Sequence, residues 1–388
     1  MSYEVMVGNK ATAVACKLAR VKVASAYPIT PQTTITEYLS DMYAGGEIPN
    51  FEFVNVEGEL SAQVVAQAAE AVGARAFTCT SGPGLLYMHH PMQETASKRL
   101  PLVMAVVHRG VKSMQPDHSD LMSQQWQGWV HIYVENAQEI LDTIVMAYKI
   151  AEDKRVRLPV AVGYDGYVLS YTAEPVEIPA QEEVDKFLPP YVPMPSILPE
   201  KVDLATMARG FGGGDPMKPW QIHHEAALNA EQVIKEVTAE YGKMFGRTWG
   251  NGMIQPYRVE GADCVITAMG TIAGTAMAAV DKLWDEGKKV GLIKIRGYLP
   301  FPRKDFQEIA NNVEAIGVFD RSCQPGIGGP VYHQIRTTLY DEEKRTPIVG
   351  FIGGLSGKEV RVHDIMKIGE KTLKVAKGGK PEAPLQWV

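Results

Sequence analysis

Four apolar segments near the start of the chain each end in a polar or glycine-containing turn, and this recurrence constrains the fold more than any other feature. The segments are KVASAY (22–27), FEFVNV (51–56), AFTCT (76–80) and LVMAVVH (102–108). Stretches with helical spacing, such as residues 60–72, separate them. Alternation of strand and helix is typical of a parallel sheet with helices on both faces, so the sequence predicts an α/β fold.

The turns after these segments carry side chains that are suited to ligand binding. They contain Thr30, Glu59, the Ser81-Gly82-Pro83-Gly84 turn and Arg109. In open parallel sheets, ligands bind in the crevice outside the carboxyl ends of the strands, because the loops converge there. We therefore expect these residues to share one cleft.

Composition sets the outer limits on the class of protein. With 388 residues, 45% hydrophobic and 22% charged, the chain has the size of two soluble domains. Its net charge of -6 and the lack of a run rich in Lys or Arg argue against nucleic-acid binding. We find neither a membrane-spanning stretch nor a signal sequence, so we expect no membrane contact and a cytoplasmic location.

The cysteines and histidines predict no metal centre in this chain. Four cysteines, namely Cys16, Cys79, Cys264 and Cys323, are far apart and form no C-x-x-C pair. This spacing argues against an iron–sulfur cluster, a zinc site or a disulfide framework. The histidines at 89, 90, 108 and 118 also lack the spacing of metal ligands.

The chain divides into three predicted regions, at 1–170, 171–255 and 256–388. The first region continues through a helical stretch at 138–153 and a strand at 158–162. The middle region is expected to be irregular, with a Pro-rich stretch (189–199), a Gly-rich stretch (210–216) and one helix (225–245). The third region alternates again, with strands expected at 263–270, 290–295 and 315–319 and a helix at 273–286.

Each candidate site residue also has an ordinary structural explanation. Glu59 opens a helix, where the helix dipole stabilises a carboxylate, and Glu57 competes with it for the functional role. Arg109 is either a surface ion-pair residue or an anchor that binds a carboxylate through two hydrogen bonds. Thr30 and the Ser-Gly-Pro-Gly turn also fit simple tight turns. The pattern alone therefore predicts a two-domain α/β protein with a cleft for an anionic ligand.

Several longer strings occur in an order that is typical of one family. They are AYPITPQTTITEYL, EGELSA, TSGPGLLYM, HRG, QGWVHIYVENAQEILD, AMGTIAGTA, GYLPFP, FDRSCQPGIGGPVY and GGLSGKEV. From about residue 5 to 375 the sequence resembles the α subunit of 2-oxoacid:ferredoxin oxidoreductases, on the pyruvate-type branch. The resemblance implies a parallel-sheet domain for the pyrimidine side of thiamine diphosphate and a second domain like the C-terminal domain of transketolase.

The resemblance also implies cofactors and partner chains. A β subunit would hold the diphosphate and its Mg²⁺ through a G-D-G motif, which this chain lacks, the nearest string being Tyr164-Asp165-Gly166. A γ subunit and a ferredoxin-like δ subunit would complete a dimer of heteromers that carries [4Fe-4S] clusters in the partners. Coenzyme A would accept the acyl group, and either ferredoxin or a flavin-bound NAD module would take the electrons.

Residue roles follow from the same resemblance. Glu59 matches the catalytic glutamate that hydrogen-bonds the pyrimidine ring nitrogen and so favours the imino tautomer. Thr30 and Arg109 match positions that bind the substrate carboxylate. The residues expected to contact the cofactor, besides Glu59, are Pro28, Ile29, Ser81, Gly82, Pro83 and Gly84.

The implied reaction is CoA-dependent oxidative decarboxylation of a 2-oxoacid, and its substrate stays open. The loop between Arg109 and Asp120 departs from the string expected for a pyruvate enzyme. Tyr27, Met88, Met92 and Met114 fit a wider pocket for an aryl or branched 2-oxoacid such as phenylglyoxylate, although Met is also common core filler. A non-oxidative split thiamine-dependent decarboxylase and a non-catalytic scaffold subunit remain as alternatives.

Overall fold

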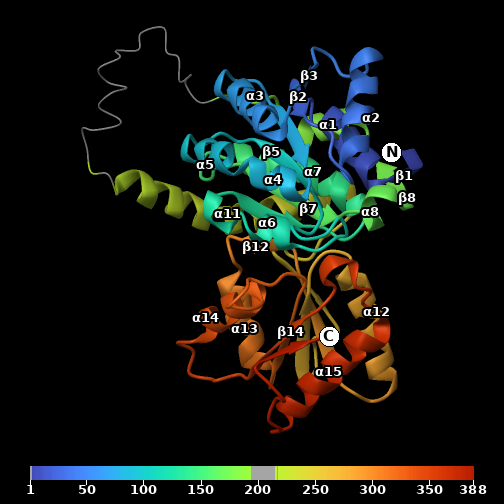
Figure 1. The fold of residues 1–388 in the computed structure, drawn as a ribbon, viewed down its shortest axis with the longest axis vertical. Helices are drawn as coiled ribbons and strands as arrows, with labels where there is room; N and C mark the ends of the chain where they lie inside the picture. The colour runs from blue at the N-terminus through green and yellow to red at the C-terminus, as the bar shows by residue number, and fades with distance from the viewer. Residues whose placement is uncertain (1, 194–214, 216) are drawn as a thin grey trace.

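The computed structural model describes residues 2–193, 215 and 217–388, and two sheets organise the described chain (Figure 1). A seven-stranded sheet lies in the upper half of the view and a six-stranded sheet lies in the lower half. We call the first sheet with the helices that cover it the first lobe. The second sheet with its own helices is the second lobe.

The first sheet has the strand order β12-β6-β7-β5-β4-β2-β3. Its strands are β2 (Val23–Ala26), β3 (Glu52–Asn55), β4 (Ala76–Thr80), β5 (Val103–His108), β6 (Val130–Tyr133), β7 (Val160–Asp165) and β12 (Gly297–Leu299). All neighbouring strands are parallel except β12, which runs antiparallel to β6. The four strands predicted at the start of the chain and the fifth predicted at 158–162 are confirmed as β2, β3, β4, β5 and β7.

Helices cover both faces of the first sheet because side chains alternate along its strands. Along β5, Val103, Ala105 and Val107 face one apolar cluster, whereas Met104 and Val106 face another. The first cluster includes α1 (Gly8–Leu18), α2 (Thr33–Ala44) and α7 (Ala137–Glu152), and the second includes α3 (Glu59–Ala71), α4 (Gly82–Tyr87) and α5 (His89–Ser97). The second cluster continues into the second lobe through residues such as Ile293, so the two lobes share this cluster, and the second lobe has a further one of its own.

The strand β6 lies inside the sheet although the sequence did not predict it. Its four residues, VHIY, are interrupted by a histidine, so they do not form a clear apolar run. His131 is nevertheless fully buried, and burial lowers its pKa to about 3. The ring is therefore neutral at pH 7 and is accommodated as a core side chain.

The middle of the chain is more regular than expected. β8 (Ala173–Ile178) pairs antiparallel with β1 (Ser2–Val7), and α9 (Gln181–Phe187) precedes α11 (Lys218–Phe245). The expectation of a single helix in residues 171–255 is therefore wrong for the described part. The strand AEPVEI escaped prediction because its glutamates and proline interrupt the apolar pattern. The Pro-rich and Gly-rich stretches lie largely outside the described residues, and the three-region division stays a prediction.

The second sheet has the strand order β15-β14-β13-β10-β11-β9, and every neighbouring pair is parallel except β11 with β9. Its strands are β9 (Ile254–Tyr257), β10 (Cys264–Ala268), β11 (Val290–Ile295), β13 (Ile316–Asp320), β14 (Ile348–Ile352) and β15 (Leu385–Trp387). Its helices are α12 (Ile272–Asp285), α13 (Arg303–Asn312), α14 (Pro330–Leu339) and α15 (Val362–Ala376). The predicted strands β10, β11 and β13 and the helix α12 are confirmed.

Short helices complete the described secondary structure. They are α6 (Ser119–Met122), α8 (Val168–Tyr171) and the 3-10 helices η1 (Gln125–Gln127) and η2 (Leu355–Gly357). None of the helices in the described ranges combines the length and the apolar character that crossing a membrane requires.

A buried ion cluster fixes the second lobe to the first. Glu139 on α7 accepts hydrogen bonds from Lys294 Nζ at 2.7 Å and from Arg296 Nε, and all three side chains are at most 1% exposed. Burial alone would raise the pKa of Glu139, but these two cations hold it below its usual value. The chain then continues from Arg296 into β12, which joins the first sheet. The two lobes are therefore held by both charge and backbone pairing.

We expect Glu139→Gln to lower the free energy of unfolding by about 3–5 kcal/mol, because it leaves the buried Arg296 without its carboxylate and leaves Lys294 with Glu135 alone. Denaturant unfolding followed by circular dichroism would measure this loss. The matched control is Glu240→Gln, whose side chain is 45% exposed and pairs with Lys149 at 2.6 Å. That change should cost about 0–1 kcal/mol. An equal, small loss for both variants would contradict a cluster that holds the lobes together.

Candidate functional site

The predicted site residues gather at the carboxyl edge of the first sheet. Thr30 follows β2, Glu59 begins the helix after β3, Ser81 follows β4 and Arg109 follows β5. These strands are parallel neighbours, so their turns leave the sheet at the same edge. The structure thus brings together residues that are up to 79 positions apart, such as Thr30 and Arg109.

Glu59, rather than Glu57, faces the interior. Glu59 is the first residue of α3 and is 9% exposed, and the positive end of the helix dipole lies beside its carboxylate. Glu57 is exposed, and a hydrogen bond from Ser61 Oγ lowers its pKa. The structure therefore buries Glu59 and exposes Glu57, while the functional role of Glu59 stays a prediction.

Two glycines of the turn after β4 allow the site side chains to approach the backbone. Gly82 has φ +43°, a conformation that favours glycine, and a Cβ there would lie 3.2 Å from Arg109 Cβ. A Cβ on Gly84 would lie 2.6 Å from Glu59 Oε1 and 2.6 Å from Thr80 Oγ1. Gly82 therefore lies against Arg109, and Gly84 lies against Glu59. Of the other two turn residues, Ser81 is buried and Pro83 is exposed.

Arg109 is half-buried and is held at the site by a backbone oxygen. Its Nη1 donates a hydrogen bond to the carbonyl of Thr30 at 3.1 Å. Within residues 2–193, 215 and 217–388, no ion pair joins Arg109 to an acid. The interpretation of Arg109 as a surface ion-pair residue is therefore wrong for the described chain. A guanidinium without a carboxylate partner retains donors for an anionic ligand.

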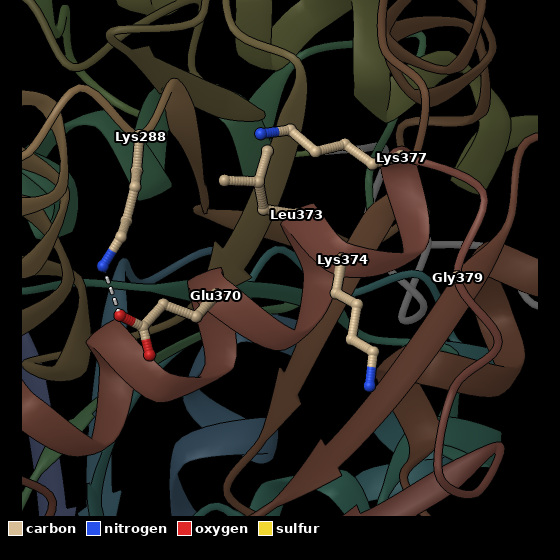
Figure 2. Close-up of a pocket in the computed structure, with 6 residues that line it drawn as sticks. All are labelled: Lys288, Glu370, Leu373, Lys374, Lys377 and Gly379. Atoms are coloured by element: carbon tan, nitrogen blue, oxygen red, sulfur yellow. Dashed lines mark hydrogen bonds and ion pairs between the residues drawn. The ribbon is translucent and has the colours of Figure 1, made fainter.

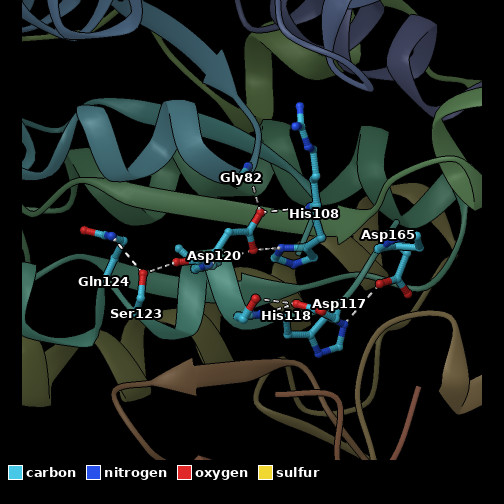
Figure 3. Close-up of polar contacts among 12 residues, drawn as sticks. Gly82, His108, Asp117, His118, Asp120, Ser123, Gln124 and Asp165 are labelled. Carbon is cyan, nitrogen blue, oxygen red and sulfur yellow. Dashed lines mark hydrogen bonds and ion pairs between the residues drawn. The ribbon is translucent and has the colours of Figure 1, made fainter. Parts of the chain in front are cut away.

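Asp120 connects the turns of Gly82 and Arg109, and Figure 3 shows its contacts with Gly82 and His108. Its Oδ2 accepts hydrogen bonds from the backbone N–H of Gly82 at 3.2 Å and of Arg109 at 3.0 Å. Its Oδ1 lies 2.8 Å from His108 Nδ1 and accepts the N–H of Leu121 at 2.7 Å. The sequence analysis missed this residue. The sequence feature that could have identified Asp120 is an acid in the first turn of the short helix α6, which follows the loop after Arg109.

The remaining expected contacts are placed near the site, and their roles stay predictions. Pro28 is exposed, whereas Ile29 and Thr30 are half-buried. Ile29 donates its N–H to Gln32 Oε1 at 3.2 Å, which shapes the turn. The contact from Arg109 reaches the carbonyl of Thr30, so a role for the Thr30 hydroxyl still rests on the family resemblance.

The methionines that suggested an aryl pocket are divided between core and surface. Met88 and Met92 are 0% exposed and belong to the core cluster, as is common for this residue type. Tyr27 is 37% exposed and Met114 is 52% exposed. The two buried methionines therefore fill the core. Of the four residues that favoured an aryl substrate, only Tyr27 and Met114 remain available to a ligand.

Asp165 lies in the string nearest to G-D-G, and both oxygens of its carboxylate contact other residues of this chain. Its Oδ1 lies 2.9 Å from Arg321 Nη1 and 3.1 Å from His118 Nε2, and its Oδ2 accepts the N–H of Thr271 at 2.8 Å. Burial alone would raise the pKa of Asp165, but the charge of Arg321 and the hydrogen bond with His118 hold it well below the usual range. This carboxylate therefore joins the lobes and is not free to hold a metal ion.

A separate hollow in the second lobe does not belong to this site (Figure 2). Its lining residues are Lys288, Glu370, Leu373, Lys374, Lys377 and Gly379. Lys288 precedes β11, whose other end leads to Arg296 and the first sheet, so the hollow lies at the far end of the second lobe. Lys288 already pairs with Glu370 at 2.5 Å, and the buried residue of this lining, Leu373, is apolar.

The fold is shared with two solved structures, an oxidoreductase and a transketolase. The structure superposes with a TM-score of 0.72 on a 2-oxoglutarate:ferredoxin oxidoreductase from Magnetococcus marinus, at 20% identity over 96% of this chain and 65% of that chain. It also superposes on a split-gene transketolase with a TM-score of 0.57, at 14% identity over 96% of this chain and 100% of that one. At these identities the likeness shows the fold alone.

The sequence comparisons identify the family. Residues 14–243 match "Pyruvate flavodoxin/ferredoxin oxidoreductase, thiamine diP-bdg", and residues 262–365 match "Pyruvate:ferredoxin oxidoreductase core domain II". The chain is 40% identical over 380 residues to pyruvate synthase subunit PorA of Methanosarcina barkeri, which covers 97% of this chain and 94% of that one. It is 38% identical over 390 residues to ketoisovalerate oxidoreductase subunit VorA of Pyrococcus horikoshii, with 99% and 97% covered. The chain therefore belongs to the 2-oxoacid:ferredoxin oxidoreductases, as an α subunit, and the predicted resemblance is confirmed.

The site has polar atoms that a thiamine pyrimidine ring can use. Thr80 Oγ1, Ser81 Oγ and Arg109 Nε are buried and have no hydrogen-bond partner among the described residues. Gly84 leaves the space beside the Glu59 carboxylate free of a side chain. An inward-facing carboxylate with unpaired hydroxyls nearby fits a ring that both donates and accepts hydrogen bonds.

We expect Gly84→Ala to displace the Glu59 carboxylate, because the new Cβ would meet Glu59 Oε1 at 2.6 Å and this flexible side chain can move away. Thiamine diphosphate affinity of the assembled complex should fall on the order of 10-fold, as titration against cofactor-dependent activity would measure. The control is Gly58→Ala, since a Cβ there would meet Tyr87 at an ordinary 3.6 Å. Equal affinities in the two variants would place the pyrimidine ring elsewhere.

Proposed function

We propose that this chain is the α subunit of a complex that oxidatively decarboxylates a pyruvate-like 2-oxoacid to an acyl-CoA and CO₂. The observation that carries the proposal is the pair of charged groups at one sheet edge. Glu59 packs against Gly84, and Arg109 packs against Gly82 of the same turn. A carboxylate for the cofactor and a guanidinium for an anionic substrate thus lie on either side of one short turn.

Glu59 serves the cofactor in this proposal. Bound thiamine diphosphate supplies the nucleophilic carbon and the electron sink for decarboxylation. Glu59 hydrogen-bonds the pyrimidine ring nitrogen and stabilises the tautomer in which the exocyclic nitrogen acts as a base. Its burial at the start of α3 supports this role, because a rigid helix holds the carboxylate in one place.

Arg109 and Thr30 serve the substrate. Arg109 binds the carboxylate of the 2-oxoacid, and the Thr30 hydroxyl orients it, so that the keto carbon faces the cofactor. A dicarboxylic substrate would need a second cation beside Thr30, and Lys112, which the sequence offers only as a remote candidate, is exposed. We therefore favour a monocarboxylic substrate, in line with the relatives named pyruvate synthase and ketoisovalerate oxidoreductase.

The other parts of the reaction belong to partner chains. A β subunit binds the diphosphate and Mg²⁺, and the γ and ferredoxin-like δ subunits carry the electrons through [4Fe-4S] clusters to ferredoxin or to a flavin-bound NAD module. Coenzyme A accepts the acyl group. The occupation of Asp165 by Arg321, His118 and Thr271 supports this division, because the string nearest to G-D-G is used within the chain. Assembly as a dimer of heteromers and a cytoplasmic location stay predictions from the sequence.

The experiment that tests the proposal is viologen reduction by the complex purified with its native partners. Pyruvate, 2-oxoisovalerate, 2-oxoglutarate and phenylglyoxylate are compared with and without coenzyme A. Preference for pyruvate or 2-oxoisovalerate supports the proposal, and preference for phenylglyoxylate would restore the aryl substrate. Release of CO₂ without viologen reduction would indicate the split decarboxylase, and no turnover of any acid would indicate a scaffold subunit.

We expect Glu59→Gln to lower kcat by about 10²–10⁴-fold, because the amide cannot support the proton transfer that the carboxylate supports. The steady-state rate of the reconstituted complex measures this loss. Glu57→Gln is the matched control, because it removes an exposed carboxylate two positions away, and its rate should stay unchanged. Full activity of the Glu59→Gln complex would exclude the proposed mechanism.

We expect Arg109→Ala to lower kcat/KM for the 2-oxoacid by about 10–100-fold, because a hydrogen bond to a charged group contributes about 1.5–3 kcal/mol. The KM for coenzyme A should not change, since Arg109 acts on the other substrate. Lys112→Ala removes an exposed cation three residues further on and serves as the control. An unchanged kcat/KM in Arg109→Ala would remove this residue from the substrate site.

A further inference from the structure

The loop that follows Arg109 lies between the two lobes. It runs from Gly110 to His118, and α6 follows it with Asp120. Figure 3 shows Asp117, His118 and Asp120 from this segment, and the side chains of His118 and Asp120 lie close to His108. A loop in this position receives contacts from the first lobe on one side and from the second lobe on the other.

The second lobe holds this loop through its backbone. Arg321, which follows β13, donates from Nη2 to the carbonyl of Pro116 at 2.8 Å. The N–H of His118 donates to the carbonyl of Arg321 at 2.9 Å, so Arg321 contacts the loop with both its side chain and its main chain. Ser356 adds a hydrogen bond from its N–H to Asp117 Oδ2 at 3.1 Å.

The same loop residues contact the immediate neighbour of Arg109. The Asp117 carboxylate lies against Gly110, where a Cβ would be 2.5 Å from Asp117 Oδ2. The N–H of Gly110 donates to the carbonyl of Gln115 at 2.8 Å and closes the loop directly after Arg109. A displacement of residues 115–117 would therefore move the backbone on which Arg109 stands.

Arg321 is itself fixed by a buried charge. Its Nη1 lies 2.9 Å from Asp165 Oδ1, and the two side chains are 7% and 0% exposed. His118 also contacts this carboxylate, and burial lowers the pKa of His118, so the ring is neutral at pH 7. The ion pair between Arg321 and Asp165 thus gives the guanidinium one orientation, in which a second nitrogen reaches Pro116.

We propose that Arg321 is a positioning residue of the second lobe that sets the place of the substrate-binding Arg109 through residues 115–118. This proposal rests on the substrate role proposed above for Arg109. It assigns a part in substrate binding to the second lobe, for which the sequence indicated no functional residue. Arg321 acts through the loop and does not touch the substrate.

A merely structural role for Arg321 would have a different signature. Loss of lobe docking would lower the stability of the chain and would lower kcat/KM for the 2-oxoacid and for coenzyme A together. Loss of Arg109 placement would lower kcat/KM for the 2-oxoacid alone. The interaction energy between the two arginines separates these cases, since residues that act through one another give non-additive losses.

The experiment is a double-mutant cycle in the complex reconstituted with its partner subunits. Arg321→Met should raise the KM for the 2-oxoacid on the order of 10-fold and leave the KM for coenzyme A unchanged. In the Arg109→Ala background, Arg321→Met should cause no further loss of kcat/KM. Additive losses, or equal changes for both substrates, would overturn the proposal.

Two further variants keep the result interpretable. Lys294→Met removes another buried cation that joins the lobes, remote from the loop, and should lower the melting midpoint without raising the KM for the 2-oxoacid. If Arg321→Met does not fold, Asp117→Ala tests the same coupling and leaves the pair of Arg321 and Asp165 intact. A KM for Asp117→Ala equal to that of the unaltered complex would then overturn the proposal.

The cycle also separates this inference from the proposed function. If Arg109→Ala alone leaves kcat/KM unchanged, the substrate role of Arg109 fails, and the positioning proposal fails with it. If Arg109→Ala lowers kcat/KM but the effect of Arg321→Met is additive, the substrate role stands and the positioning role is wrong.

Discussion

The carboxylate of Asp120 is the contact on which the geometry of the site depends. It is fully buried and has four partners, the backbone N–H groups of Gly82, Arg109 and Leu121 and the ring of His108. Hydrogen bonds to a buried carboxylate are stronger than those between neutral groups, so the carboxylate holds these donors firmly. The turns after β4 and β5 are therefore fixed relative to each other before a ligand binds, which lowers the cost of ordering them during the reaction.

Contacts from the second lobe continue this arrangement outward. Arg321 fixes the loop after Arg109, and Asp165 fixes Arg321, so charged groups connect β7 of the first sheet to β13 of the second. A shared apolar cluster and the ion cluster around Glu139 also hold the two lobes together. The second lobe thus contacts the loop after Arg109 through Arg321 and Ser356.

Much of the fold was predictable because long apolar runs mark buried parallel strands. The apolar runs before residue 110 form strands close to their predicted positions. The strands that were predicted in the third region also lie close to where they were expected. The elements that escaped prediction depend on contacts across the chain. β6 contains His131, whose ring is neutral and is buried in the core. β12 has only three residues and is stabilised by pairing with the edge of β6. β8 is stabilised by pairing with β1, the first strand of the chain.

The sequence by itself determined the family, the alternation of strands and helices, and the turns that hold Glu59, Gly84 and Arg109. These features are local, since they depend on apolar periodicity and on residue types at fixed spacing. The tertiary structure alone decided that Glu59 rather than Glu57 faces inward and that Asp120 joins two turns. It also decided that Asp165 forms a buried ion pair with Arg321. Such choices depend on which groups distant in sequence become neighbours, and burial then makes their charges strong enough to hold one geometry.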